Sequence, residues 1–125
     1  MKPYTTDFDP PAPLIEVMIS NVLNRRLRHT FPALLDTGPD VTAIPEICFH
    51  ALKLYAIAEI QFEDVQANLI NAEIYAVKFM INKFVIPRQE VVLTGLDFVI
   101  IGRDVLKHFN LHLYGREQMF ELVVI

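Results

Sequence analysis

The sequence predicts a mainly β, barrel-like domain. Short segments rich in β-branched and aromatic residues recur along its 125 residues, and only two short stretches read as helices. Strands do not alternate with long helices, as they do in folds built from βαβ units. A chain of this length forms one domain of ordinary size. Its apolar fraction of 53% leads us to expect that some apolar surface is buried between subunits.

The chain is expected to begin with an extended arm, residues 1–13, ahead of a single domain over residues 14–125. The arm is polar, and proline excludes a helix there because it fixes φ and lacks an N–H group. The prolines of the arm are Pro3, Pro10, Pro11 and Pro13.

A hairpin is predicted next, with one strand over Leu14–Ser20, a turn at Asn21–Asn24 and a second strand over Arg25–Leu35. The second strand leads directly into Asp36. Apolar residues alternate along the first strand, which is typical of a strand with one buried face. These alternating residues are Ile15, Val17 and Ile19.

Two short helices are predicted. The first covers Glu46–Leu54 and starts after Pro45, because proline is tolerated in the first turn of a helix. The residues expected on its apolar face are Ile47, Ala51 and Leu54. The second helix follows Gly102, and Asn110 is its expected stop. The residues of its apolar stripe are Val105, Leu106 and Phe109.

The remaining strands are expected to pair as hairpins. Ala58–Ile74 reads as a hairpin around a polar tip at Glu63–Asn68. The other expected strands are Ile74–Ile81 and Phe84–Leu93 around an Asn82-Lys83 turn, an apolar strand that begins at Phe98, and two closing strands around Gly115-Arg116.

Charge and composition argue against several classes of function. The net charge is −4 with acids and bases interspersed, so nucleic acid is not an expected partner. The one short basic cluster, Arg25, Arg26 and Arg28, reads as an exposed strand edge. The four histidines lack the spacing of a zinc site, so neither a metal nor another cofactor is expected.

Cys48 is the only cysteine, so no intrachain disulfide can form, and we interpret it as a packed helix residue. A single cysteine suits a reducing compartment. The sequence shows no secretory leader, and no apolar run approaches the ~18 residues of a membrane span. A cytoplasmic protein with no membrane partner is therefore predicted.

The stretch with the clearest chemistry is Asp36-Thr37-Gly38. An apolar run enters it and turn residues follow it, which indicates a buried strand that delivers a carboxylate to an exposed loop. A rigid support of this kind suits a catalytic acid. By itself, however, such a tripeptide is a turn in most proteins.

Further residues around Asp36 and a second stretch make the sequence resemble the retropepsin-like aspartic proteases. Asp36-Thr37-Gly38 matches the signature loop of that family, and Asp40, Thr42 and Pro45 extend this match. Ile100-Ile101-Gly102-Arg103 matches the apolar-apolar-Gly motif of the same family. The resemblance covers roughly residues 14–122. It implies a closed acid-protease barrel, a β-hairpin flap over the substrate and aspartic endopeptidase activity.

Peptide hydrolysis by carboxylates needs two of them sharing one proton, one acting as base and the other as acid. This chain carries a single Asp-Thr-Gly sequence, so it cannot assemble the pair alone. We therefore predict a symmetric homodimer in which Asp36 of each subunit meets on the two-fold axis, as in the single-domain members of the family. A peptide or protein is the implied substrate.

The resemblance also implies supporting roles around the catalytic Asp36. Thr37 bonds across to the other subunit's loop in the family, and Asp40 and Arg103 occupy positions that form an ion pair there. Gly38 is expected to tolerate strained φ and to bring its N–H group to the carboxylate. Pro39 departs from the alanine or serine that is usual at its position.

Substrate-binding residues are the least specified part of the prediction. The floor of the cleft is assigned to Val41, Ile44 and Ile100, which points to hydrophobic substrate side chains. The flap is assigned to the hairpin Ala58–Ile74, with tip residues Val65, Gln66 and Ala67. This hairpin has no glycine, whereas retroviral flap tips are rich in it.

An alternative function uses the same fold without catalysis. In that hypothesis Pro39 or the unusual flap prevents turnover, and the protein is a peptide-binding or dimerisation module. A small metal-dependent or lipid-binding barrel lacks a supporting ligand cluster in the sequence.

Overall fold

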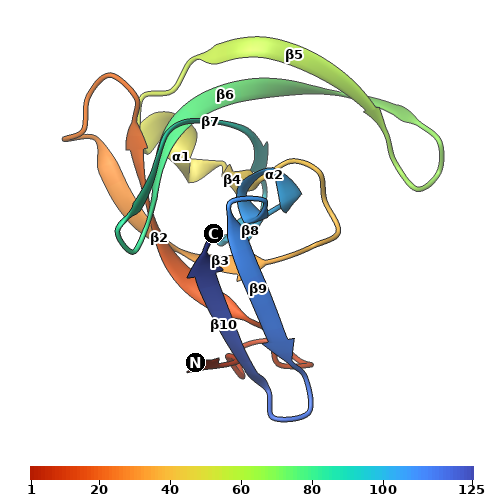
Figure 1. The fold of residues 1–125 in the computed structure, drawn as a ribbon. Coiled ribbons are helices and arrows are strands. Elements are labelled where there is room, and N and C mark those ends of the chain that lie inside the picture. The colour runs from red at the N-terminus through yellow and green to blue at the C-terminus, as the bar shows by residue number, and fades with distance from the viewer.

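The computed structural model describes all 125 residues. Figure 1 shows a strand-rich fold with a long hairpin that extends well beyond the rest of the molecule. The strands are β1 (Lys2–Pro3), β2 (Leu14–Asn21), β3 (Arg28–Leu35), β4 (Ala43–Pro45), β5 (Ala56–Glu63), β6 (Leu69–Ile81), β7 (Phe84–Thr94), β8 (Val99–Ile101), β9 (Phe109–Tyr114) and β10 (Met119–Val124). The helices are α1 (Ile47–Ala51) and α2 (Arg103–Leu106), and both are far too short to cross a lipid bilayer.

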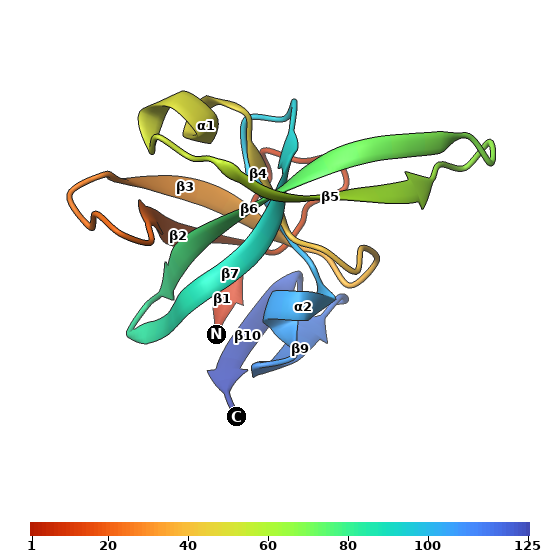
Figure 2. The same cartoon turned by 90° about the horizontal axis from the view of Figure 1, so that it is seen from above.

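Six strands close into a barrel. The larger sheet has the order β2-β3-β8-β4-β7-β6-β5, and β2 also pairs with β6, which joins the two sides of the sheet. Only β5 remains outside the ring, paired with the outer part of β6. Figure 2 looks at the same barrel from above. The predicted mainly β, closed-barrel fold with two short helices is confirmed.

The core fills the inside of this barrel. Side chains of β2 alternate between core and surface as predicted, with Ile15, Val17 and Ile19 buried. Buried residues from the other barrel strands, from both helices and from β9 and β10 complete a single hydrophobic cluster. Because one face of every barrel strand meets this cluster, a slip of one residue would move apolar side chains into water, which sets the strand register.

Strand β6 is longer than the sequence predicts. A break was expected at Ile74, but Leu69–Ile81 is one continuous strand of 13 residues. Its first half pairs only with β5 and is largely exposed, whereas its second half lies between β2 and β7 in the barrel. Side chains are mostly exposed before Ile74 and mostly buried or half-buried from Ile74 onward. In the sequence this change looks like the end of one strand and the start of another, although the backbone continues as one strand.

The predicted apolar face of the first helix is right for Leu54, which is buried, and wrong for Ile47 and Ala51, which are exposed. Pro45 ends β4 rather than opening the helix, and Ile47 is 64% exposed. The residues that face the core are Cys48 and Leu52, which are four apart and therefore on one side of the helix. Cys48 is a packed helix residue, as predicted. Burial raises the pKa of its thiol to about 12, so it is protonated and unreactive at neutral pH.

The second helix is shorter than predicted. It ends at Leu106, and Phe109 and Asn110 already belong to β9, where Phe109 pairs with Val124. The ring of Phe109 packs at 5.0 Å from that of Phe84, edge to face. Phe109 therefore joins the core from a strand, with no need for further helical turns.

The N-terminal residues are tied to the end of the chain. Strand β1 pairs antiparallel with β10, and Thr5 bridges Ala12, so residues 1–13 fold back on themselves. A second small sheet with the order β1-β10-β9 results. The division into an arm over residues 1–13 and a domain over residues 14–125 stays a prediction.

Candidate active site

Asp36 lies where β3 ends and is held by the second motif. β3 and β8 pair in parallel, with Leu35 opposite Ile101. The backbone N–H of Asp36 then donates to the carbonyl of Ile101 at 3.0 Å. The two stretches singled out in the sequence, 65 residues apart from Asp36 to Ile101, therefore meet at one point. The carboxylate is half-buried at the end of a rigid, hydrogen-bonded strand pair.

Gly38 is required by a close approach. Its N–H donates to Oδ1 of Asp36 at 2.9 Å, and a Cβ on this residue would lie only 3.2 Å from the same oxygen. The expectation of a strained φ is wrong, since no glycine in the chain has a positive φ. What glycine provides here is space beside the carboxylate. Its N–H group can then approach Oδ1 and orient the Asp36 side chain through a hydrogen bond.

Gly102 packs against the backbone of the same loop. A Cβ there would lie 3.0 Å from the carbonyl oxygen of Pro39 and 3.0 Å from the carbonyl carbon of Val41. The adjacent N–H of Arg103 donates to the Pro39 carbonyl at 3.0 Å. Pro39 is thus used through its carbonyl, which proline supplies as well as alanine or serine would.

Arg103 and Asp40 form the predicted ion pair. Both side chains are largely exposed, at 59% and 80%. An exposed ion pair contributes roughly 0–1 kcal/mol to the stability of a monomer. The ion pair connects the loop after Asp36 to the start of α2. It adds to the backbone hydrogen bond from the Arg103 N–H to the Pro39 carbonyl.

A buried polar network lies beneath this loop, and sequence reasoning missed it. Thr42 is fully buried, and its hydroxyl donates to Asp104 Oδ1 at 2.6 Å and accepts the N–H of Gly102 at 3.0 Å. Asp104 Oδ2 accepts the N–H of Thr42 at 3.1 Å and an amide N–H of Gln89 at 3.0 Å. Asp104 therefore neither caps the helix nor serves as a solvated surface charge, because Thr42 and Gln89 occupy its two oxygens. No local signal marks this role, because its partners, Thr42 and Gln89, come from two other segments of the chain.

The hairpin of β5 and β6 forms as predicted, with Glu63 opposite Leu69 across the tip. Figures 1 and 2 show it extending far from the barrel. The three tip residues predicted to bind substrate, Val65, Gln66 and Ala67, are all exposed. Ala67 adopts a φ of 62°, the left-handed conformation that a glycine would otherwise favour.

Asp64 holds this tip together. Its carboxylate accepts the backbone N–H groups of Asn68 at 2.9 Å and Gln66 at 2.8 Å. The Asn68 bond, followed by the Gln66 bond and the Asn68 side-chain amide, lowers the pKa of Asp64 below its ordinary value of 3.8. The ionised carboxylate thus replaces glycine as the device that shapes the turn.

Because the folded tip lowers the pKa of Asp64, the ionised form is favoured by the ordered tip. Its contribution is complete above about pH 3.8 and is lost as the pH falls through the lower, folded value. We expect the protection of the Gln66 and Asn68 amides, measured as the intrinsic exchange rate at each pH divided by the observed rate, to fall below that range. Asp64→Ala should show low protection at every pH. Amide exchange followed by NMR measures this, and equal protection of the wild-type tip in both ranges contradicts it.

The predicted floor residues are placed differently from one another. Val41 and Ile100 are half-buried, and Ile100 alternates with Val99 and Ile101, which point into the core. Ile44 has no exposed surface and belongs to the core cluster. The assignment of Ile44 to substrate contact is therefore wrong for the chain as it stands, because β4 turns that side chain inward.

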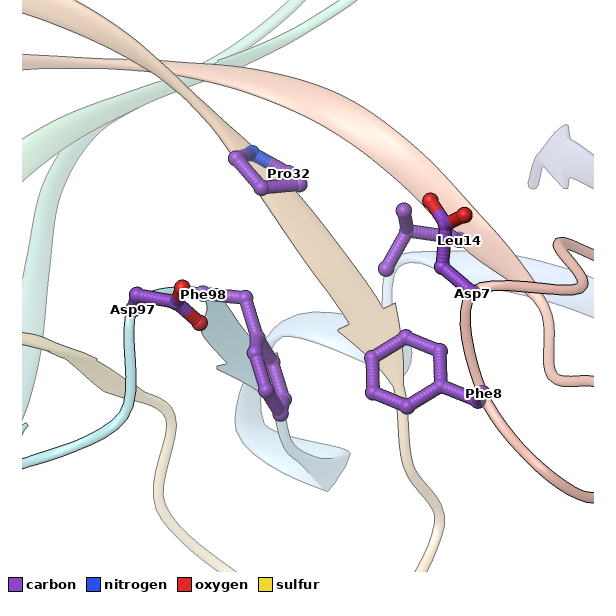
Figure 3. Close-up of a pocket in the computed structure, with 6 residues that line it drawn as sticks. All are labelled: Asp7, Phe8, Leu14, Pro32, Asp97 and Phe98. Atoms are coloured by element: carbon purple, nitrogen blue, oxygen red, sulfur yellow. The ribbon is translucent and has the colours of Figure 1, made fainter.

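A pocket on the outer side of β2 and β3 was not predicted. It has a volume of about 400 Å³ and is lined by Asp7, Phe8, Leu14, Pro32, Asp97 and Phe98. Figure 3 shows the rings of Phe8 and Phe98 next to each other; their centroids are 5.1 Å apart and they pack edge to face. The pocket was not predicted because residues 1–13, which supply Asp7 and Phe8, were expected to form a separate arm.

Comparison with known proteins agrees with this geometry. The sequence model of the family described as "Retroviral aspartyl protease" matches residues 10–114. No curated protein matches the sequence significantly.

Solved structures resemble the fold. The retropepsin-like aspartic protease from Rickettsia conorii has a TM-score of 0.61 and 15% identity, and the match covers 98% of this chain and 86% of that chain. Simian foamy virus (mac) protease has a TM-score of 0.59 and 15% identity over 76% of this chain and 92% of that chain. EIAV protease, in complex with the inhibitor HBY-793, has a TM-score of 0.52 and 23% identity over 77% and 86%. At these identities the similarity concerns the fold alone.

Proposed function

Because this chain belongs to the retroviral aspartyl protease family, we propose that it is an aspartic endopeptidase active as a homodimer. Its catalytic pair consists of Asp36 and Asp36 of the partner subunit. The observation that carries the proposal is the position of Asp36, held at the end of β3 by the Ile101 carbonyl and by the Gly38 N–H. One chain supplies one such carboxylate, so a two-fold axis must supply the other.

The chemistry follows from two carboxyl groups that share a proton. The ionised one takes a proton from a water molecule, whose oxygen attacks the carbonyl carbon of the peptide. The protonated one donates its proton to the carbonyl oxygen. In the second step the amide nitrogen is protonated and the C–N bond breaks, which leaves a carboxylic acid and an amine.

Two features of the chain support dimerisation. Thr37 is exposed, and its hydroxyl has no hydrogen-bond partner within the chain, so it is free to bond across an interface. The edge of β9 that faces away from β10 is also unpaired. An unpaired strand edge is a surface on which a second chain can add a strand.

The hairpin of β5 and β6 is proposed as the flap, with Val65, Gln66 and Ala67 at its tip. Substrate would lie in an extended conformation between this flap and the loop after Asp36, so that alternate side chains enter pockets. Val41 and Ile100 remain the candidates for the floor, and hydrophobic residues are expected beside the scissile bond. A cytoplasmic location remains a prediction that rests on the single cysteine.

The Arg103→Ala variant separates monomer stability from assembly. Because the Asp40–Arg103 pair is exposed in the monomer, we expect its loss to change the free energy of unfolding of the isolated chain by less than about 1 kcal/mol. The dissociation constant of the dimer should rise, so that the variant is already monomeric at concentrations where the parent is still a dimer, because the pair positions the loop that meets the partner. Sedimentation velocity over a concentration series measures this. An unaltered dissociation constant would show that Arg103 does not contribute to dimer formation.

Incubation with a diverse peptide library from acidic to neutral pH tests the function. We expect cleavage within peptides, inhibition by pepstatin and activity that rises with the dimer fraction as the protein concentration increases. A purified dimer that cleaves no peptide at any pH would instead favour the non-catalytic peptide-binding module. The flap tip without glycine, held by Asp64, is the feature that favours this second candidate.

A further inference from the structure

Four cations gather on the outer face of the barrel, away from the candidate active site. Register places Arg28 and Lys78 on either side of Ser20, in one row across β3, β2 and β6. Arg25 and Arg26 come from the turn that precedes β3. Since neighbouring strands are about 4.8 Å apart, the Arg28 and Lys78 backbones are about 10 Å apart, and both side chains can reach one ligand above Ser20.

These cations have no acidic partners. The two ion pairs of the chain are Arg88–Glu90 and Arg103–Asp40, and neither involves the cluster. Four of the eleven lysines and arginines therefore lie unpaired in one place on a protein of net charge −4. The nearest acid along the same face of β2 is Glu16, about 13 Å from Ser20. Such an arrangement costs stability through repulsion and is favourable only when an anion occupies it.

The surface is hollowed at this cluster. One cavity of about 190 Å³ is lined by Met18, Ser20, Arg25, Arg28, Lys78 and Met80. A second, broader depression is lined by Arg25, Arg26 and Arg28, so the two share a pair of arginines. Met18 and Met80 are paired across β2 and β6 and form an apolar floor beside the row of cations.

The composition of the cluster indicates the charge of its ligand. Three cations and one hydroxyl converge on the smaller cavity, which matches a compact dianion with several acceptor oxygens better than a single carboxylate. Arginine is suited to phosphate, because its planar guanidinium donates two parallel hydrogen bonds. The adjoining depression, lined by arginine alone, would take a second anionic group of the same ligand.

Two observations favour a polypeptide over nucleic acid. No aromatic side chain lines either cavity, whereas proteins that bind single strands stack bases on aromatic rings. The methionine floor offers instead an apolar surface for an aliphatic side chain. We propose that Ser20, Arg25, Arg28 and Lys78 form a binding site for a phosphorylated side chain followed by acidic residues on a partner polypeptide.

Binding of a fluorescently labelled peptide that contains phosphoserine followed by glutamates tests the site. The full chain carrying Asp36→Asn keeps the peptide intact, so the result does not depend on whether the proposed peptidase activity exists. We expect the phosphopeptide to bind at least about tenfold more tightly than the same peptide with serine, and binding to weaken as salt is added. NMR shifts should map to Ser20, Arg28 and Lys78.

The Arg28→Gln/Lys78→Gln variant should lose this binding and keep its fold, because both changes remove repulsion, one at an exposed and one at a half-buried position. The Lys107→Gln/Arg116→Gln variant removes one lysine and one arginine elsewhere on the surface, and it should bind as the parent does. Equal loss in both variants would show a nonspecific charge effect and overturn the proposal. Three further results would also overturn it: equal affinity for the unphosphorylated peptide, equal affinity for inorganic phosphate alone, or tighter binding of oligothymidylate.

Discussion

Replacement of Asp36 by Asn is expected to abolish peptide cleavage and leave the fold and the dimer in place. Asparagine has nearly the same shape, so the bond from its N–H to the Ile101 carbonyl should persist. It cannot take a proton from water, and in a homodimer the change removes both carboxylates at once. General acid–base groups contribute about 10²–10⁴-fold to a rate, so we expect the initial rate of cleavage to fall by at least this factor.

The control for this variant is Glu117→Gln, which removes one exposed carboxylate from the turn between β9 and β10. It should cleave the same peptides at the parent rate. Initial rates on one library peptide, together with sedimentation of all three proteins, measure the effect. If Asp36→Asn retained the parent rate as a dimer, Asp36 would not be the catalytic group, and another acid would have to be sought.

Replacement of Thr42 by Val is expected to destabilise the chain by about 2–4 kcal/mol. Valine has nearly the same volume, but it lacks the hydroxyl that bonds Asp104 at 2.6 Å and accepts the Gly102 N–H at 3.0 Å. The change therefore loses a bond to a charged group and also leaves a buried N–H without a partner. Each of these is among the more costly single defects in a folded protein.

Urea unfolding of Thr42→Val and Thr42→Ser distinguishes the hydroxyl from the packing. The serine variant keeps both hydrogen bonds and should lose about 1 kcal/mol for the missing methyl group. The slope of the unfolding free energy against urea should stay constant, so that the midpoint reports stability. Equal destabilisation by valine and serine would mean that the methyl group, and not the network, stabilises this loop.

This network also explains why the active-site loop is rigid. Thr42 lies six residues after Asp36, and its partners Gly102 and Asp104 flank Arg103, which bonds Pro39 and pairs with Asp40. The loop after Asp36 is consequently attached at three points to the start of α2. Preorganisation of this kind limits how far a catalytic carboxylate can move from its working position.

Much of the fold could be predicted because its signals are local. Alternation along β2 marked its buried face, and turn residues marked the ends of β6, β7, β9 and β10. The two stretches that meet at Asp36 and Ile101 were also singled out, because each carries recognisable residues. Local signals misled where burial changed within one element, as at Ile74 in β6, and where a helix had too few turns to show its face, as at Ile47 in α1.

The sequence alone determined the family, the mainly β class and the presence of a single Asp36-Thr37-Gly38 motif, because each depends on residue types whose chemistry or backbone preference can be recognised in a short stretch. The pairing of Asp40 with Arg103 was predicted from the resemblance to the family. Only the tertiary structure decided that Ile44 faces the core, that Asp104 bonds Thr42 and Gln89, and that Lys78 joins the arginines beside Ser20. These contacts join segments distant along the chain, and their partners are chosen by strand register and barrel closure, which no single segment encodes.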